Sequence, residues 1–342
     1  MLSRVAERLY WLGRYVERAE NTARLVGVNA QLLLDMPGPV TVLWQSLIEI
    51  LGRQADFSEH HQAASERNVI KYTVADEKSP ASLVSALRMA RENARTVREV
   101  LPSEAWELVN HLYWSAHESA EQALTRKHRQ EFLDNVVLQC QQFSGMLMNT
   151  MSHREPYHFV SLGWSIERAD MTSRILDVGC TYASGQHGEV LAAHENVLWM
   201  NVLLSLSAYQ MYRQQVRERV NGRDVVAFLL QDPAFPHAVS CCLDAVEHAL
   251  SELPRNRTPL RVNREVVQYV GRADPDALVV AGLHDYLDAL QAEFGRLHAQ
   301  IEATWFANTE DPVGGESAQH QVGIGGEHRA PLDPGSARGT TE

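Results

Sequence analysis

Residues 12–26 read LGRYVERAENTARLV and residues 162–176 read LGWSIERADMTSRIL, so one motif occurs twice, and the second copy begins 150 residues after the first (162 − 12). Both copies have a Leu-Gly start, a Glu-Arg-Ala core, a threonine and a later arginine, whereas the apolar positions agree only as a class. A core helix requires volume and hydrophobicity, which substitute freely. The sequence therefore predicts two related helices whose charged residues matter, and an internal duplication.

The charged positions of the motif lie on defined sides of the predicted helix. At about 100° per residue, Glu17, Glu20 and Arg24 fall within one narrow arc, while Arg18 projects to another side. The second copy repeats this arrangement. The binding or interaction candidates are therefore Glu17, Arg18, Glu20 and Arg24, together with Glu167, Arg168, Asp170 and Arg174.

Three interpretations of these charges remain open at this stage. Exposed pairs at helical spacing would stabilise a helix by only a few tenths of a kcal/mol. A buried structural network would instead lose about 3–5 kcal/mol if one partner were removed. The other two interpretations are a ligand or catalytic site and a surface for a partner protein.

A shorter segment that resembles the motif occurs at residues 91–95. It contains arginine, glutamate and asparagine within an apolar helical framework. It is too short to count as a repeat, and it adds the candidates Arg91, Glu92, Asn93 and Arg95.

Helical periodicity dominates the chain, and strand patterns are nearly absent. The first helix has an apolar stripe running from Val5 to Val26, with Tyr10, Trp11 and Tyr15 on its other side, which predicts a central helix with its charges inside the protein. Further helices are expected at about 40–52, 80–100, 102–125, 128–152, 158–183, 190–219, 236–253 and 276–306. These patterns indicate an all-α multi-helix bundle over 1–306, with related halves at about 1–155 and 156–306. Residues 307–342 are rich in glycine, proline and serine, and we expect a disordered tail.

Composition argues against several function classes. The net charge of −12 does not favour nucleic acid as a partner. The first residues interleave charges with apolar side chains, unlike a signal peptide, and no stretch reaches the roughly 18 uncharged residues of a membrane span, so we expect a cytoplasmic protein. Phosphate-binding loops, dinucleotide fingerprints and zinc-protease motifs are missing from the sequence, and we expect no cofactor and no metal.

With the Glu-Arg helix in place, the chain resembles the alpha-E family, a bacterial all-helical domain named for its E-R motif. The matching blocks are MLSRVAERLYWLGRYVERAENTARL at 1–25, ARENARTVREVLPSEAWELVN at 90–110, LGWSIERADMTSRIL at 162–176 and VVAFLLQDPAFPHAVSCCL at 225–243. One departure is visible, because relatives usually have proline-arginine-serine where this chain has Pro236-His237-Ala238.

The resemblance implies which genes lie next to this one, but it does not imply a particular reaction. Genes of this family tend to lie beside a circularly permuted ATP-grasp protein and a transglutaminase-like peptidase, which together look like a peptide-synthesis or peptide-modification system. The leading hypothesis is therefore an accessory helical partner of the ATP-grasp enzyme that holds substrate or organises the complex. The alternatives are an enzyme that uses Glu17 and Glu167 as acid and base, with arginines anchoring a peptide carboxylate, and a structural scaffold. The oligomeric state stays open.

Overall fold

The computed structural model describes residues 1–35, 40–183 and 194–306. Within these ranges the chain forms helices joined by short loops and contains no strand, so the predicted all-α bundle is confirmed. The predicted disordered tail, residues 307–342, lies outside the described residues.

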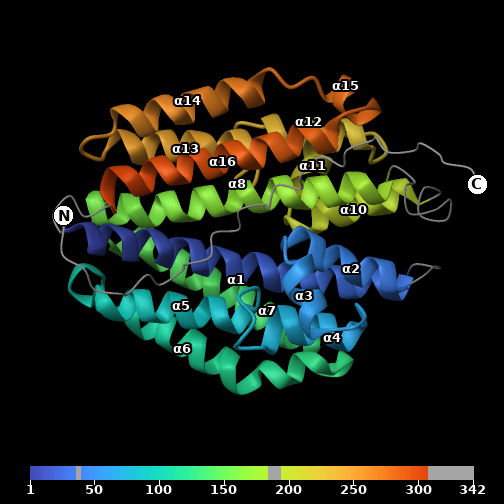
Figure 1. The fold of residues 1–342 in the computed structure, drawn as a ribbon, viewed down its shortest axis with the longest axis horizontal. Coiled ribbons are helices and arrows are strands. Elements are labelled where there is room, and N and C mark those ends of the chain that lie inside the picture. The colour runs from blue at the N-terminus through green and yellow to red at the C-terminus, as the bar shows by residue number, and fades with distance from the viewer. Residues whose placement is uncertain (36–39, 184–193, 307–342) are drawn as a thin grey trace, which may run out of the picture.

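Two groups of four helices make up most of the described chain. The first group consists of α1 (Ser3–Asp35), α5 (Leu83–Thr96), α6 (Ser103–Ser119) and α7 (Arg126–Thr150), and the second of α8 (Glu155–Ala183), α13 (Val239–Ser251), α14 (Arg257–Gly271) and α16 (Leu283–Trp305). In each group every helix packs against the next one along the chain, and the last packs against the first. The helices α1 and α8 lie side by side at the centre and join the two groups (Figure 1).

Shorter helices link the first and second helix of each group. The first half has α2 (Val40–Ile50), α3 (Gln54–His60), α4 (Glu66–Ile70) and a π-helical turn at Lys71–Ala75, and the second half has α10 (Glu195–Ser205), α11 (Tyr209–Gln215) and α12 (Gly222–Gln231). The turn after α2 contains Gly52 at φ 63°, and the matching turn after α10 contains Ser207 at φ 53°. This correspondence agrees with an internal duplication, which as the origin of the two halves stays a prediction. A short helix, α15 (Pro275–Val280), and 3-10 turns at Arg98–Val100 and Ala120–Leu124 complete the described elements.

The central helices are buried on every side. Each residue of α1 from Leu9 to Ala23 is buried, so the predicted central helix with internal charges is confirmed. Backbone meets backbone where α1 crosses α8, because a Cβ added at Gly13 would lie 2.3 Å from the Val160 carbonyl oxygen. A Cβ added at Gly163 would lie 2.1 Å from the Tyr10 carbonyl oxygen. Each glycine thus lies against a backbone carbonyl of the other helix.

Two predicted helices are interrupted in the structure. The helix expected at about 190–219 is divided into α10 and α11, because Ser207 adopts a left-handed backbone conformation that no α-helix contains. The helix expected at 276–306 is divided into α15 and α16, because Gly282 lies between them at φ 90°.

The helix α12 follows the region expected to be helical at about 190–219 and was not itself predicted. Asn221 begins α12, since its side chain accepts a hydrogen bond from the backbone N–H of Asp224 at 2.9 Å. The sequence reading also missed α14, in which Pro259 lies in the first turn, where proline is well tolerated, and Val262, Val266 and Val270 form the buried stripe.

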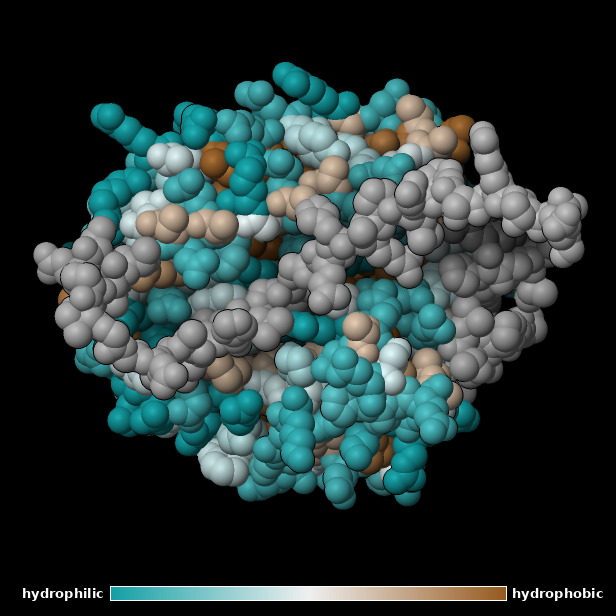
Figure 2. Space-filling view, in the orientation of Figure 1, coloured by the Kyte–Doolittle hydropathy of each residue, from teal (hydrophilic) through white to brown (hydrophobic). Residues whose placement is uncertain are grey.

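The surface offers scattered apolar side chains. The face in Figure 2 is mostly hydrophilic, with hydrophobic residues in small groups among polar ones. None of the described helices is long and apolar enough to cross a bilayer.

The glycine contact can be tested by substitution. We expect Gly13→Ala to destabilise the protein by about 3 kcal/mol, because the new methyl group must push α1 away from the Val160 carbonyl. The matched control is Gly145→Ala on α7, where an added Cβ meets nothing within 4 Å and should stabilise the helix by roughly 0.5–1 kcal/mol. Urea unfolding of both variants measures the difference. Equal effects at the two sites would contradict the close approach of α1 and α8.

Candidate functional site

The repeated glutamates and arginines form crossed ion pairs between the central helices. Arg18 on α1 donates from Nε and from a terminal nitrogen to the Glu167 carboxylate on α8, at 2.5 and 3.0 Å. Arg168 on α8 donates in the same way to Glu17 on α1, with both distances 2.7 Å. Both pairs are forked, which is the strong geometry for arginine and carboxylate. Each motif therefore supplies the partner for the other, and Arg18 is buried whereas Arg168 is 27% exposed.

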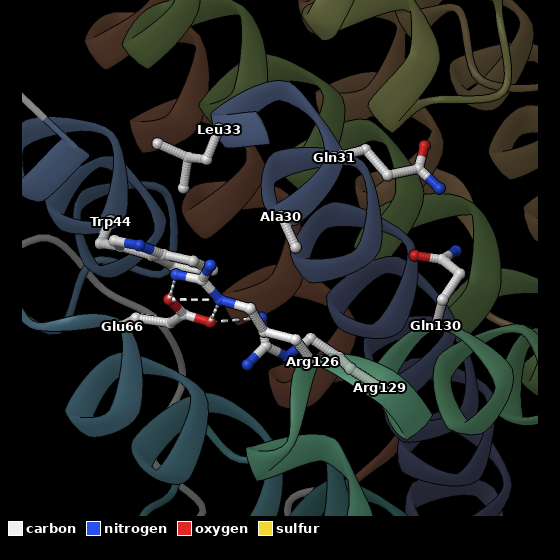
Figure 3. Close-up of a pocket in the computed structure, with 8 residues that line it drawn as sticks. All are labelled: Ala30, Gln31, Leu33, Trp44, Glu66, Arg126, Arg129 and Gln130. Carbon is white, nitrogen blue, oxygen red and sulfur yellow. Dashed lines mark hydrogen bonds and ion pairs between the residues drawn. The ribbon is translucent and has the colours of Figure 1, made fainter. Parts of the chain in front are cut away.

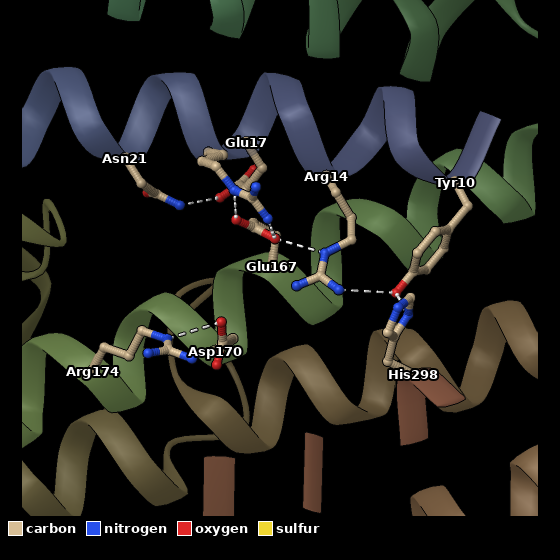
Figure 4. A network of polar contacts seen from close by, with 9 residues as sticks. Tyr10, Arg14, Glu17, Asn21, Glu167, Asp170, Arg174 and His298 are labelled. Carbon is tan, nitrogen blue, oxygen red and sulfur yellow. Dashed lines mark hydrogen bonds and ion pairs between the residues drawn. The ribbon is translucent and has the colours of Figure 1, made fainter. Parts of the chain in front are cut away.

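The two crossed pairs are not equivalent. Glu167 also accepts a 2.6 Å hydrogen bond from Nε of Arg14, so one carboxylate faces two guanidinium groups (Figure 4). Glu17 instead accepts its additional bond from the amide of Asn21, at 3.3 Å. The position that matches Arg14 in the second copy is Trp164. Positive charge is therefore concentrated on the Glu167 side.

Burial makes these interactions energetically important. Glu167 and Glu17 are each only 1% exposed, and Arg18 is 5% exposed. Burial acts to raise the pKa of Glu167, but the charges and hydrogen bonds of Arg18 and Arg14 outweigh it and lower that pKa to about 2. Aromatic rings shield the arginines from water, since the Arg18 guanidinium lies 5.4 Å from the ring centre of Tyr15. The carboxylate of Glu167 is thus held ionised.

The remaining charges of each motif pair along their own helix. Arg24 donates to Glu20 at 2.5 Å, and Arg174 donates to Asp170 at 3.1 Å. Gln141 on α7 donates a second hydrogen bond to Glu20 at 3.0 Å. Burial and the nearby charge of Glu17 raise the pKa of Glu20, while Arg24 opposes that rise.

Arg24 connects the motif to the turn between α10 and α11. Its guanidinium donates a hydrogen bond to the hydroxyl of Ser207, the residue with the left-handed backbone. A non-glycine residue in this conformation costs free energy and persists only where the surroundings hold it. The contact with Arg24 is one such restraint.

A chain of hydrogen bonds leads from Glu167 toward α16. Arg14 donates to the hydroxyl of Tyr10 at 3.3 Å, and that oxygen lies 2.9 Å from Nδ1 of His298 (Figure 4). Burial lowers the pKa of His298 to about 4, and the charge of Arg14 adds to the effect. His298 is therefore neutral at pH 7.

His237, where the resemblance implies an arginine, lies beside the other crossed pair. Thr172 donates to the backbone carbonyl of His237 at 2.9 Å. Burial holds the pKa of His237 well below its usual range, and the charges of Arg168 and Arg24 lower it further. A neutral imidazole at this position adds no third positive charge, whereas an arginine would.

The third set of candidates lies apart from the crossed pairs. The Arg91 guanidinium hydrogen-bonds to Asn110 and Glu92, at 2.8 and 2.6 Å, and lies 5.5 Å from the ring centre of Trp106 on α6. Arg95 pairs with Glu92 at 2.9 Å on the exposed side. Asn93 is buried and accepts a 3.1 Å hydrogen bond from Arg8. The structure therefore does not bring these residues into the central network.

A surface cavity of about 450 Å³ lies away from the network (Figure 3). Its lining residues are Ala30, Gln31, Leu33, Trp44, Glu66, Arg126, Arg129 and Gln130. Arg126 and Arg129 both pair with Glu66, at 2.5 and 2.9 Å. Both arginines of this cavity are thus already paired with one carboxylate of the chain itself.

Two clusters in the described chain have side chains close enough for a metal ion, namely Asp56, Glu59 and His60, and Asp177, His284 and Asp288. In the second cluster the Nδ1 atom of His284 lies 2.6 Å from Asp177, and its Nε2 atom lies 3.7 Å from Asp288. Each ring nitrogen faces a carboxylate, which is the geometry of a bridging ion pair. We assign no metal to either cluster.

Sequence reasoning missed Arg14, Tyr10 and His298. Comparison of the two copies could not find Arg14, because Trp164 takes its place in the second copy. The four-residue spacing of Tyr10, Arg14 and Arg18 places all three on one face of α1, and this was the available signal. His298 is distant in sequence and joins the site only through the packing of α16.

Removal of the Glu167 carboxylate should lower the free energy of unfolding. We expect Glu167→Gln to destabilise the protein by about 3–5 kcal/mol, because Arg14 and Arg18 would keep their charges inside the core without a counter-ion. Glu247→Gln, which removes an exposed pair with Arg264, should cost less than about 1 kcal/mol. Denaturant unfolding at pH 7 compares the two variants. Similar small losses would show that the central pairs are not desolvated.

The neutral state of His298 predicts a pH effect on stability. Its pKa in the folded protein is about 4 against an ordinary value of 6.5, so between these pH values the unfolded chain binds a proton that the folded chain does not. Stability should therefore fall as pH drops from 6.5 to 4, by about 2 kcal/mol from this group. The free energy of unfolding, measured across this range for the native chain and for His298→Gln, isolates the contribution. Parallel pH profiles would contradict it.

Comparison with known proteins places the chain in a family. A family model described as Alpha-E, a predicted alpha-helical domain with a conserved ER motif, matches residues 1–306. The chain is 24% identical over 324 residues to an uncharacterized protein of Mycobacterium bovis and to one of Mycobacterium tuberculosis strain CDC 1551. Each alignment covers 88% of this chain and only 35% of the relative, so the chain spans about a third of their length. No solved structure matches it significantly. Because the family model spans both Glu-Arg helices and the bundles around them, the chain belongs to the Alpha-E family.

Proposed function

We propose that this chain is a non-catalytic helical partner of a circularly permuted ATP-grasp enzyme in a peptide-synthesis or peptide-modification system, where it holds substrate or organises the complex. The observation that carries the non-catalytic part is the pairing of the motif carboxylates. Glu17, Glu167, Glu20 and Asp170 each accept a hydrogen bond from an arginine. Such a network suits a rigid binding scaffold.

The same geometry disfavours the acid–base enzyme. A general acid or base needs a pKa near the working pH and access to the substrate. Glu167 is 1% exposed, has a pKa of about 2 and is saturated by two arginines. Glu17 is equally buried and forked to Arg168. Neither carboxylate meets these requirements.

The partner role draws support from two further observations. The curated relatives contain the matched segment within a longer chain, of which the alignment covers 35%, so this domain occurs there joined to other sequence. The family resemblance associates the domain with an ATP-grasp neighbour. In that pairing the ATP-grasp protein would activate a carboxylate as an acyl phosphate and join it to an amine.

The proposal is tested with the two purified proteins. We expect a complex at micromolar concentrations in size-exclusion chromatography with light scattering, and a rise in ATP turnover on at least one amino acid of a panel. Arg24→Ala, at the partly exposed edge of the network, should lower the stimulated turnover about tenfold, which is about 1.4 kcal/mol. Arg264→Ala on α14 is the matched control and should leave the turnover unchanged.

Two results would overturn parts of this proposal. Failure to associate, with and without nucleotide and amino acids, together with unchanged turnover, would remove the partner role. Turnover of amino acids or ATP by this chain alone would show that it is itself an enzyme.

A further inference from the structure

A second cavity, of about 350 Å³, lies where α10, α11 and residues 216–221 meet. Its apolar wall consists of Val197 and Met200 on α10, Tyr209 on α11, and Val220. Sites for small ligands have volumes of roughly 300–1,000 Å³ and combine apolar walls with a few polar groups. The cavity is therefore large enough for a molecule of the size of an amino acid.

Three arginines line the same cavity, namely Arg213 on α11 and Arg217 and Arg219 in the segment that follows. The Arg213 guanidinium donates a hydrogen bond to the backbone carbonyl of Glu218, so it holds the segment that carries the other two. The side chains of Arg217 and Arg219 are exposed and make no hydrogen bond or ion pair with any described residue. Two cationic groups are thus free to bind a ligand.

Acidic side chains near the cavity do not balance these charges. Glu218 is the only acid among the described residues that line it. The neighbouring Asp224 pairs with Arg223 at 2.7 Å, and Asp232 accepts a hydrogen bond from Gln215 at 2.8 Å. The arginines therefore outnumber the carboxylate available to them, although the chain as a whole has a net charge of −12.

The matching segment of the first half contains no arginine. Residues 61–64, between α3 and α4, read His-Gln-Ala-Ala, whereas residues 216–220, between α11 and α12, read Val-Arg-Glu-Arg-Val. Both segments lead into a capped helix, since Ser65 and Asn221 each accept a hydrogen bond from a backbone N–H of the helix that follows. A segment of this kind forms without arginine, so the arginines call for another explanation.

We propose that this cavity binds an organic anion whose carboxylate or phosphate group is held by Arg213, Arg217 and Arg219. A planar guanidinium matches two oxygens of either group through paired donors. The apolar part of the ligand lies against Met200 and Tyr209, where its burial removes apolar surface from water. The inference deepens the proposed function by naming the class of ligand held, and its relevance to substrate rests on that function.

The test measures binding to the isolated full chain by calorimetry, so a failure here leaves the experiment on the complex standing. The probes are N-acetylleucine and phenyl phosphate, each an anion with an apolar part, in a buffer of low ionic strength because salt screens exposed charges. At least one should bind the native chain with a Kd of about 1 mM or below. Acetate, inorganic phosphate and the uncharged N-acetylleucinamide should each bind at least about tenfold more weakly.

The double variant Arg217→Ala, Arg219→Ala should bind the preferred anion at least about tenfold more weakly than the native chain. Because both side chains are exposed and unpaired, it should unfold at the same temperature as the native chain. The matched control is Arg67→Ala, Arg88→Ala, which removes the same charge from exposed positions outside the cavity and should bind as the native chain does.

The two probes also distinguish the sources of the anionic group. Tighter binding of N-acetylleucine would identify a carboxylate ligand, and tighter binding of phenyl phosphate a phosphate ester. The proposal would be overturned by lack of binding of both, by equal binding of the uncharged amide or of acetate and inorganic phosphate, or by unchanged binding in the double variant.

Discussion

The close crossing of α1 and α8 is the constraint on which the rest of the structure depends. Gly13 and Gly163 bring the two backbones so near that neither helix has room for a methyl group there. At this spacing an arginine one turn further along each helix reaches the glutamate of the other. The crossed pairs therefore follow from the glycines. They in turn fix the register of the helices, because sliding either helix would leave buried charges unpaired.

The contacts between α1 and α8 follow an approximate two-fold symmetry, which two pairs of matching positions break. The glycine contacts and the forked ion pairs are reciprocal. Arg14 and Trp164 occupy matching positions and break the relation, as do Arg53 and Ala208. The first difference places a second arginine, Arg14, on Glu167. The otherwise reciprocal centre thus carries one additional arginine beside Glu167.

The buried network also keeps the carboxyl group of Glu167 ionised. Burial alone would favour a neutral carboxyl group, which is how many enzymes obtain a catalytic acid. Two arginines on Glu167 reverse that tendency and hold the group ionised. The glutamates and arginines that made the motif a candidate catalytic site thus pair with one another across the two helices. The crossed pairs hold α1 and α8 in one position relative to each other.

Much of the fold could be predicted from the sequence, because amphipathic periodicity is a local property. The stripe of α1, its aromatic opposite side and the pairs Glu20–Arg24 and Asp170–Arg174 all depend on spacing within one helix. The breaks at Ser207 and Gly282 were not predicted, because a left-handed residue can be serine or glycine and neither type demands it. The start of α12 at Asn221 was not predicted for a similar reason, since asparagine occurs at either end of a helix.

The sequence by itself determined that the chain is helical, that one motif occurs twice, and which charged residues the copies share. Tertiary structure alone decided that Arg18 pairs with Glu167 and Arg168 with Glu17, because these partners lie about 150 residues apart and no local rule connects them. It also decided that Arg14, Tyr10 and His298 form one chain of contacts. Ion pairing acts over a few ångströms of space. It can be assigned only when the packing of distant helices has set those distances.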